Sequence, residues 1–298
     1  MRLAAIDIGS NAARLLISEV VVSDVEKPRF NKLNLLRVPL RLGFDVFETK
    51  MIPPAKEQMI IKTLQSYKYL LQVYDVEYCK ACATSAMRDA VNSESIIKKV
   101  KEETGIQIEI LTGDEEALVI YETHIAENLN KDSSYLYIDV GGGSTELTLF
   151  SNNQVIFKQS FDIGTIRLLK KQVQEIQWNK MREFVRDKTR VYKQLVAIGT
   201  GGNINKVFSM SKKKDGKPLN LDLLKDYHKE FSSFSVDDRM RIYNLREDRA
   251  DVIVPALLIF INVMRSANAN EIFVPKIGLV DGLIQHLYQQ IKMREIEV

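Results

Sequence analysis

The sequence predicts an α/β protein built from two similar domains with a cleft between them. Residues 7–15, DIGSNAARL, align without a gap on residues 139–147, DVGGGSTEL. Each copy follows a short apolar run and leads into another, which is the pattern of a β-hairpin closed by a tight turn. Because two such hairpins recur among alternating strands and helices, we expect a duplicated domain.

The remaining elements follow the same theme. Helices are expected where apolar residues recur with helical spacing, with Pro53 and Pro54 in a first turn and Gly105 at a helix end. In the first half we expect strands at 3–6, 15–20, 35–43, 76–84 and 106–111 and helices at 53–74, 92–105 and 114–129. In the second half we expect strands at 135–140, 145–150, 154–161 and 194–203 and helices at 164–174 and 178–193.

The boundary between the two domains is expected near residue 126. The first domain then spans residues 1–125 and the second spans residues 126–282. The C-terminal segment, residues 283–298, has the pattern of a helix and is a candidate to return and pack on the first domain.

Composition restricts the class of protein. Hydrophobic residues at 45% and charged residues at 27% are typical of a soluble globular protein. No apolar run approaches the about 20 residues of a membrane helix, and no secretory leader is recognised, so we expect a cytoplasmic protein without a membrane partner. A net charge of +3 does not indicate nucleic-acid binding.

Cys79 and Cys82 lie in one predicted strand, and we interpret them as buried structural thiols rather than a zinc site.

Three glycine-containing loops point to phosphate. They are DIGSN at 7–11, DVGGGST at 139–145 and GTGGN at 199–203, and each follows a predicted strand. Backbone amides in such loops can point at an anion, and glycine lets phosphate oxygens approach the chain closely. A tight hairpin without a ligand is the alternative for any single loop. The candidate phosphate-binding residues are Ser10, Asn11, Arg14, Gly141, Gly142, Gly143, Ser144, Thr145, Gly201 and Gly202.

Carboxylates at matching positions predict a metal. Asp7 and Asp139 end the first strand of each repeat, and Glu146 follows the second glycine loop. Carboxylates beside phosphates repel them unless a hard cation intervenes, and Mg²⁺ prefers oxygen ligands of this kind. The alternative is that each Asp only caps its turn.

Two further segments carry candidate catalytic groups. TGDEEAL, residues 112–118, places a carboxylate where it could take a proton from an attacking water, although acidic residues at a helix start also interact with its dipole. ATSAMRDA, residues 83–90, follows a strand and opens a turn, and Arg88 within it is a candidate donor to phosphate. A surface salt bridge is the alternative for Arg88.

In this order, AIDIGSNAARLLI, ATSAMRDA, TGDEEAL, IDVGGGSTEL and AIGTGGN resemble the exopolyphosphatase and guanosine pentaphosphate phosphatase family. That family belongs to the superfamily of actin, heat-shock chaperones and sugar kinases, so the resemblance implies duplicated ribonuclease-H-like, actin-like ATPase domains. It also implies the site roles. Glu116 is the catalytic base, Asp139 and Glu146 bind metal and position water, Asp7 belongs to the first phosphate loop, and Arg88 and residues 141–145 contact phosphate.

The activity implied by the resemblance is Mg²⁺-dependent release of orthophosphate from the ends of inorganic polyphosphate, with a monovalent cation such as K⁺ as a further option. The alternatives are a guanosine pentaphosphate 5′-phosphatase and a non-catalytic sensor of polyphosphate or alarmone. The partner is then one of these phosphorylated substrates, and a homodimer is an option. Two departures bear on the choice, because Ala12 replaces the usual Ser and Val280 replaces an Arg common in the family.

Overall fold

A computed structural model describes residues 1–22, 28–113, 115–116, 119, 133–152, 154–192, 195–275 and 278–296. The chain forms two compact units, residues 1–123 with 279–298 and residues 124–278. The expected boundary near residue 126 and most of the helix expected at 114–129 lie outside the described residues. The second unit ends at Gly278, whereas the sequence placed its end at residue 282.

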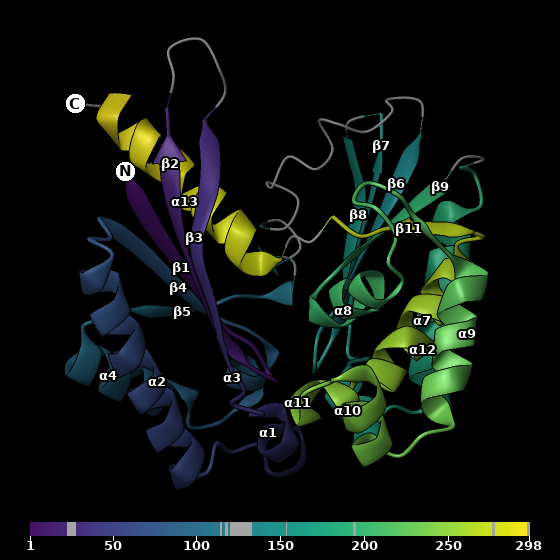
Figure 1. Ribbon diagram of the computed structural model, residues 1–298, viewed down its shortest axis with the longest axis horizontal. Coiled ribbons are helices and arrows are strands. Elements are labelled where there is room, and N and C mark those ends of the chain that lie inside the picture. Colours follow the sequence, from purple (N-terminus) through teal and green to yellow (C-terminus); the bar gives the residue numbers. More distant parts are fainter. Residues whose placement is uncertain are drawn as a thin grey trace. The chain divides into compact units, whose positions relative to one another are not determined.

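The first unit contains a five-stranded sheet in the order β3-β2-β1-β4-β5 (Figure 1). β1 is antiparallel to β2, which is antiparallel to β3, and β1 is parallel to β4, as β4 is to β5. The third strand begins earlier than expected and ends before Pro39, which has no backbone N–H to donate to a neighbouring strand. The strands are β1 (Arg2–Ile8), β2 (Ala13–Val21), β3 (Arg29–Val38), β4 (Tyr78–Ala83) and β5 (Ile108–Ile110).

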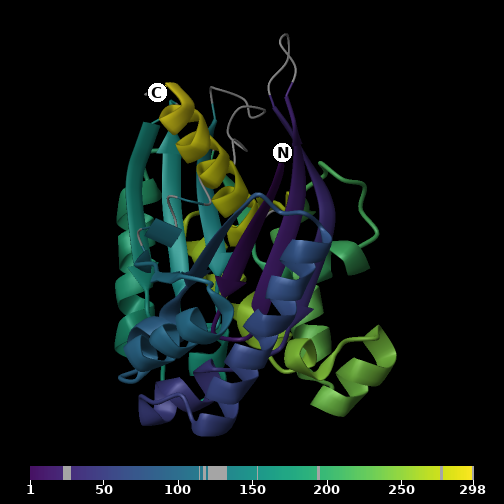
Figure 2. The same cartoon turned by 90° about the vertical axis from the view of Figure 1, so that its left-hand side faces the viewer.

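Helices cover both faces of this sheet. α13 packs on β1, β2 and β4, and its Leu283 and Ile284 are buried against Leu3 and Leu16. Figures 1 and 2 show α13 on one side of the sheet and α2 with α4 on the other. The C-terminal helix therefore belongs to the core of the first unit. The helices are α1 (Gly43–Thr49), α2 (Pro54–Val73), α3 (Ser85–Asp89), α4 (Ser93–Thr104) and α13 (Leu279–Ile296).

The second unit repeats the strand order of the first. Its sheet runs β10-β11-β9-β6-β7-β8, so β8-β7-β6-β9-β11 corresponds to β3-β2-β1-β4-β5. The directions agree as well, because β6, β7 and β8 are antiparallel neighbours and β9 is parallel to β6. This repeat confirms the predicted duplicated α/β fold. The strands are β6 (Ser134–Val140), β7 (Thr145–Ser151), β8 (Gln154–Phe161), β9 (Leu195–Thr200), β10 (Leu219–Asn220) and β11 (Glu271–Phe273).

One large apolar core stabilises the second unit. Residues of β6, β7 and β9 are buried together with side chains of α7, α9 and α12, among them Trp178 and Phe260. No helix in the described part of the chain has the length and apolarity to cross a membrane. The helices are α6 (Thr165–Leu169), α7 (Glu175–Thr189), α8 (Gly202–Met210), α9 (Leu221–Ser232), α10 (Val236–Tyr243), α11 (Glu247–Ala250) and α12 (Ile253–Ser266).

Candidate functional site

The two predicted glycine turns have the same backbone geometry. The amide of Gly9 donates to the carbonyl oxygen of Ala12 at 3.1 Å, and the amide of Gly141 donates to that of Ser144 at 2.9 Å. A Cβ atom on either glycine would lie 3.2 Å from the carbonyl oxygen that accepts the hydrogen bond of that glycine. Glycine therefore permits a turn that a larger residue would have to distort.

The charged side chains beside these turns differ. Asp7 is the cross-strand partner of Arg14, whereas Asp139 is the partner of Glu146. In the first unit Arg14 Nη1 lies 3.0 Å from Asp7 Oδ2 and forms an ion pair with it. In the second unit two carboxylates oppose each other, and like charges directly opposite on a sheet are unfavourable without compensation.

Hydroxyl groups extend the carboxylate pair of the second unit. Thr200 Oγ1 donates to Asp139 Oδ1 at 2.8 Å, and Ser160 Oγ donates to Glu146 Oε1 at 3.1 Å. We call these four residues, Asp139, Glu146, Thr200 and Ser160, the acidic row. Sequence reasoning missed the roles of both hydroxyl residues. Ser160 on β8 belongs to no predicted motif, and in the third loop only the glycines, not Thr200, were singled out.

The corresponding row of the first unit contains a thiol. Cys82 is paired with Asp7 across β1 and β4, as Thr200 is with Asp139. Burial raises the pKa of the Cys82 thiol from 9.0 to about 12, so the group stays neutral. We call Arg37, Arg14, Asp7 and Cys82 the mixed row, since Arg37 is the β3 partner of Arg14. The prediction of two buried thiols is wrong for Cys79, which is exposed near the start of β4.

Glu115 and Glu116, in the acidic segment 112–116, have different roles. Glu115 accepts from the amide and the hydroxyl of Thr112 at 2.7 and 2.9 Å, which closes a capping box and lowers the pKa of Glu115. Glu116 is instead buried, with 8% of its surface exposed, and its Oε2 lies 3.6 Å from Nη1 of Arg88. Of these two carboxylates, only Glu116 faces the interior of its unit. Asp114 lies outside the described residues.

Arg88 sits on a short helix that directly follows β4, where the sequence predicted that a turn begins after a strand. α3 starts at Ser85, directly after β4 and Thr84, and places Arg88 in its last turn. Arg88 Nη1 donates to the carbonyl oxygen of Leu111 at 2.6 Å, which fixes the guanidinium beside Glu116. The same helix brings the Ser85 hydroxyl to 2.7 Å from that of Ser10 in the first glycine turn.

The third glycine loop lies against the acidic row. Gly201 has a φ of +97°, and a Cβ atom there would lie 3.0 Å from Asp139 Oδ1. Sequence reasoning missed Arg249, whose Nη1 donates to Asn203 Oδ1 at 2.8 Å and whose guanidinium lies directly beside Gly202. Arg249 comes from α11, far along the chain, so no local pattern linked it to this loop.

Thr145 does not fit its predicted role. Its side chain is fully buried at the start of β7, and its hydroxyl donates to the carbonyl oxygen of Ile163 at 2.5 Å. The hydroxyl is therefore used inside the second unit, and we remove Thr145 from the candidate phosphate-binding residues.

Among the residues that the structure describes, no three His, Cys, Asp or Glu side chains gather as a metal site. The acidic row nevertheless has the oxygen donors that suit Mg²⁺, which is commonly held by one or two carboxylates together with water and substrate oxygens. Asp7 fits a metal less well, because a cation at its Oδ2 would compete with the guanidinium of Arg14.

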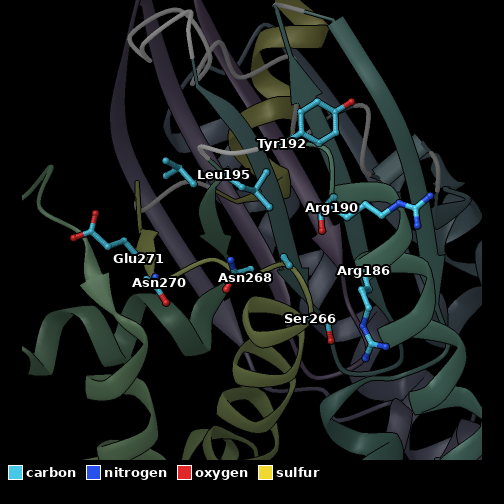
Figure 3. A pocket seen from close by; sticks show the side chains of 11 residues that line it. Arg186, Arg190, Tyr192, Leu195, Ser266, Asn268, Asn270 and Glu271 are labelled. Atoms are coloured by element: carbon cyan, nitrogen blue, oxygen red, sulfur yellow. The ribbon is translucent and has the colours of Figure 1, made fainter.

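A cavity of about 660 Å³ lies elsewhere in the second unit. It is lined by residues at the C-terminal ends of α7 and α12 and at the start of β9, whereas Thr200 ends that strand. In Figure 3 the side chain of Arg190 extends away from Asn268, Asn270 and Glu271, so these groups do not converge on one point. None of the candidate site residues lines this cavity.

Paired glycine turns on a duplicated α/β fold, with carboxylates near the ends of the first strands, are the arrangement from which the sequence predicted a phosphate site. The chain belongs to the Ppx/GppA phosphatase family, whose model matches residues 20–290. The resemblance inferred from the motifs is thereby confirmed at the level of the family.

Curated relatives support the same family. A bifunctional 3-dehydroquinate synthase/phosphatase of Fusobacterium nucleatum is 31% identical over 81% of this chain and 35% of its own. Exopolyphosphatase 2 of Mycobacterium tuberculosis is 32% identical over 56% of this chain and 53% of its own. The chain thus spans about a third to a half of the length of these relatives.

Solved structures share the fold over nearly the whole chain. The crystal structure of the Aquifex aeolicus Ppx/GppA family member has a TM-score of 0.75 and 25% identity, covering 97% of this chain and 98% of that one. An exopolyphosphatase from Cytophaga hutchinsonii has a TM-score of 0.84 and 24% identity, with 98% of each chain covered. The likeness to the second structure supports the fold alone.

Proposed function

We propose that this protein is a Mg²⁺-dependent exopolyphosphatase that removes the terminal phosphoryl group of inorganic polyphosphate and releases orthophosphate. The observation that carries the proposal is the acidic row, where Asp139 faces Glu146 directly beside the triple-glycine turn. The name of the Mycobacterium tuberculosis relative, exopolyphosphatase 2, supports this substrate class. The end of a polyphosphate chain carries repeated negative charges and binds metal ions. The glycine turn would bind the phosphoryl oxygens, and the acidic row would bind the metal.

Glu116 is the general base in this proposal. It is a buried carboxylate that takes no part in the capping box, and Arg88 holds a compensating charge 3.6 Å from it. Water attacks the terminal phosphorus in line, Glu116 accepts the proton, and the bond to the bridging oxygen breaks. The released products are orthophosphate and a polyphosphate shorter by one unit.

The remaining residues bind and orient the substrate. Backbone amides of the glycine turns and the guanidinium of Arg88 donate to phosphoryl oxygens, where developing charge is stabilised by fixed donors. Asp139 and Glu146 would hold Mg²⁺, oriented by the hydroxyls of Thr200 and Ser160. When bound, Mg²⁺ supplies positive charge at the phosphoryl oxygens.

A guanosine pentaphosphate 5′-phosphatase is the second candidate. A guanosine-5′-triphosphate,3′-diphosphate pyrophosphatase of Photobacterium profundum is 22% identical over 98% of this chain and 60% of its own. Val280, where the family commonly has Arg, lies on α13 and is buried in the apolar core of the first unit. A buried valine offers no donor to a nucleotide, which favours inorganic polyphosphate as the substrate.

The test measures orthophosphate release from polyphosphates of several lengths and from guanosine pentaphosphate, with Mg²⁺. Glu116→Gln is expected to lower the rate by about 10²–10⁴-fold. Glu115→Gln is the matched control, because Glu115 is exposed and serves the capping box. If both variants release phosphate like wild type, Glu116 is not the base. If wild type binds polyphosphate without releasing phosphate, the protein is a sensor.

A further inference from the structure

We propose that Arg167 is a positioning residue, which fixes the peptide planes of the triple-glycine turn so that three amides point together at a phosphoryl group. Arg167 lies on α6, the short helix that follows β8, and no motif assigned it a role. The ligand part of this inference rests on the proposed function, whereas the effect on the turn itself does not.

Three successive carbonyl oxygens of the turn are held by the same short segment. Gly141 O accepts from the amide of Thr165 at 3.0 Å, and Gly142 O accepts from that of Ile166 at 2.9 Å. Gly143 O accepts from Nε of Arg167 at 2.8 Å. Arg167 is therefore the side-chain member of a three-donor set.

Fixing a carbonyl group also fixes the next amide. In a trans peptide unit the C=O of one residue and the N–H of the next point in opposite directions. The held oxygens of residues 141, 142 and 143 thus direct the amides of Gly142, Gly143 and Ser144 to the other side of the turn. Within the described parts of the chain, these three amides donate no hydrogen bond to protein. Three aligned donors without protein acceptors suit the oxygens of a phosphoryl group.

The first unit holds two of the three matching carbonyl oxygens in a similar way. Ser10 O, equivalent to Gly142 O, accepts from the amide of Gly43 at 2.9 Å. Asn11 O, equivalent to Gly143 O, accepts from the amide of Arg41 at 2.8 Å. The backbone donor at Arg41 in the first unit thus corresponds to the Arg167 side chain in the second. The same carbonyl oxygen is thus held in both units, although the donor differs. This indicates that the orientation of the turn is important.

The packing around this contact leaves little room for the turn to move. A Cβ atom on Gly164 would lie 2.3 Å from Gly142 O. The side chain of Arg167 is 13% exposed, and its Nη2 lies 3.9 Å from Asp162 Oδ1. Removing the guanidinium would free the Gly143 carbonyl, and a methyl group at residue 164 would displace the turn directly.

The experiment compares Arg167→Ala, Arg167→Lys and the control Arg186→Ala, which removes an exposed arginine of α7. The ¹⁵N–¹H signals of Gly142, Gly143 and Ser144 are recorded without ligand and during titration with orthophosphate.

We expect Arg167→Ala to shift these signals in the free protein and to weaken orthophosphate binding about 10-fold or more. In assays of polyphosphate hydrolysis we expect kcat/KM to fall by about 10²-fold, the effect of misplacing catalytic groups by about 1 Å. Arg167→Lys should recover part of both losses, since its ammonium can donate to the same carbonyl.

Two results would overturn the inference in different ways. If Arg167→Ala leaves the signals and the affinity for orthophosphate as Arg186→Ala does, Arg167 does not position the turn. If it lowers only the melting temperature, with kcat and KM of the folded protein unchanged, its role is structural alone. If wild type binds no orthophosphate while Arg167→Ala still moves the free signals, the positioning of the turn stands and the proposed function fails.

Discussion

The hairpin of β1 and β2 and the hairpin of β6 and β7 close their turns with the same hydrogen bond, at 3.1 and 2.9 Å. Their first strands both have Asp as the penultimate residue, yet the residue that faces it is Arg14 in one and Glu146 in the other. The neighbour on the parallel strand is Cys82 in one and Thr200 in the other. The duplicated backbone is thus retained while the charge of the row beside it has changed from mixed to acidic.

This difference suggests a division of labour between the units. The carboxylate of Asp7 is already compensated by Arg14, so the mixed row suits an anion held by the turn amides. The acidic row instead suits a cation, with hydroxyl groups that orient its two carboxylates. We therefore expect the acidic row to bind a cation and the turn beside the mixed row to bind an anion.

The largest effect is expected when the acidic row is given the charges of the mixed row. In Glu146→Arg, an ion pair with Asp139 replaces the facing carboxylates. We expect phosphate release to fall by roughly 10³-fold or more, because the metal contributes several kcal/mol to the transition state. Phosphate release and Mg²⁺ titration calorimetry measure the change. Glu146→Gln is the control that removes the charge alone, and activity of Glu146→Arg close to wild type would contradict the assignment.

Breaking the ion pair of the mixed row should affect stability more than catalysis. Arg14→Met leaves the carboxylate of Asp7 buried beside an apolar side chain. We expect the free energy of unfolding to fall by about 1–3 kcal/mol, because the buried carboxylate of Asp7 loses a donor whose own side chain is 29% exposed. Urea denaturation at pH 7 measures it. The double variant Asp7→Asn, Arg14→Met should recover much of the loss, and equal stability of the single variant and wild type would show that the pair is unimportant.

A smaller effect is expected from the hydroxyl that supports Asp139. Thr200→Val keeps the shape of the side chain and removes the donor to Asp139 Oδ1. We expect the affinity for Mg²⁺ to fall about 10–100-fold, as for other residues that orient a metal ligand. Cys82→Val changes the equivalent position of the mixed row and should leave the Mg²⁺ affinity unchanged. Calorimetric titrations of the two variants test both expectations.

The smallest effect concerns pH. The pKa of Cys82 rises from 9.0 to about 12 on folding because the thiol is buried. The unfolded chain therefore ionises first, so the stability from the neutral thiol is present below pH 9 and declines as the pH rises toward 12. We expect Cys82→Ala to unfold with a shallower pH dependence above pH 9, by at most about 1.4 kcal/mol per pH unit. Identical slopes for the variant and wild type would contradict this.

Much of the fold could be predicted from the sequence, because the repeat is local and free of gaps. The two hairpins were predicted, whereas the facing of Asp7 with Arg14 and of Asp139 with Glu146 was found only in the structure. Elements with a long periodic pattern were found close to their true bounds, such as α2 at Pro54–Val73. The third strand was misplaced, because β3 is largely exposed and has a weak apolar pattern.

The supporting residues of the site could not be predicted. Ser160, Arg167 and Arg249 reach Glu146 and the glycine loops from other strands and helices, and only the tertiary fold brings them there. Thr200 lies in the third predicted loop, but its contact with Asp139 depends on the pairing of β6 with β9. Thr145 shows the opposite error. It belongs to the motif by sequence, but the start of β7 buries its hydroxyl against Ile163.

The division of labour between the two rows is tested most directly by anomalous diffraction from crystals grown with Mn²⁺, as a substitute for Mg²⁺, and orthophosphate. We predict an anomalous peak coordinated by the carboxylates of Asp139 and Glu146, and none within coordination distance of Asp7. The peak should vanish in the double variant Asp139→Asn, Glu146→Gln. A metal coordinated by Asp7, or one that persists in the double variant, would contradict the account.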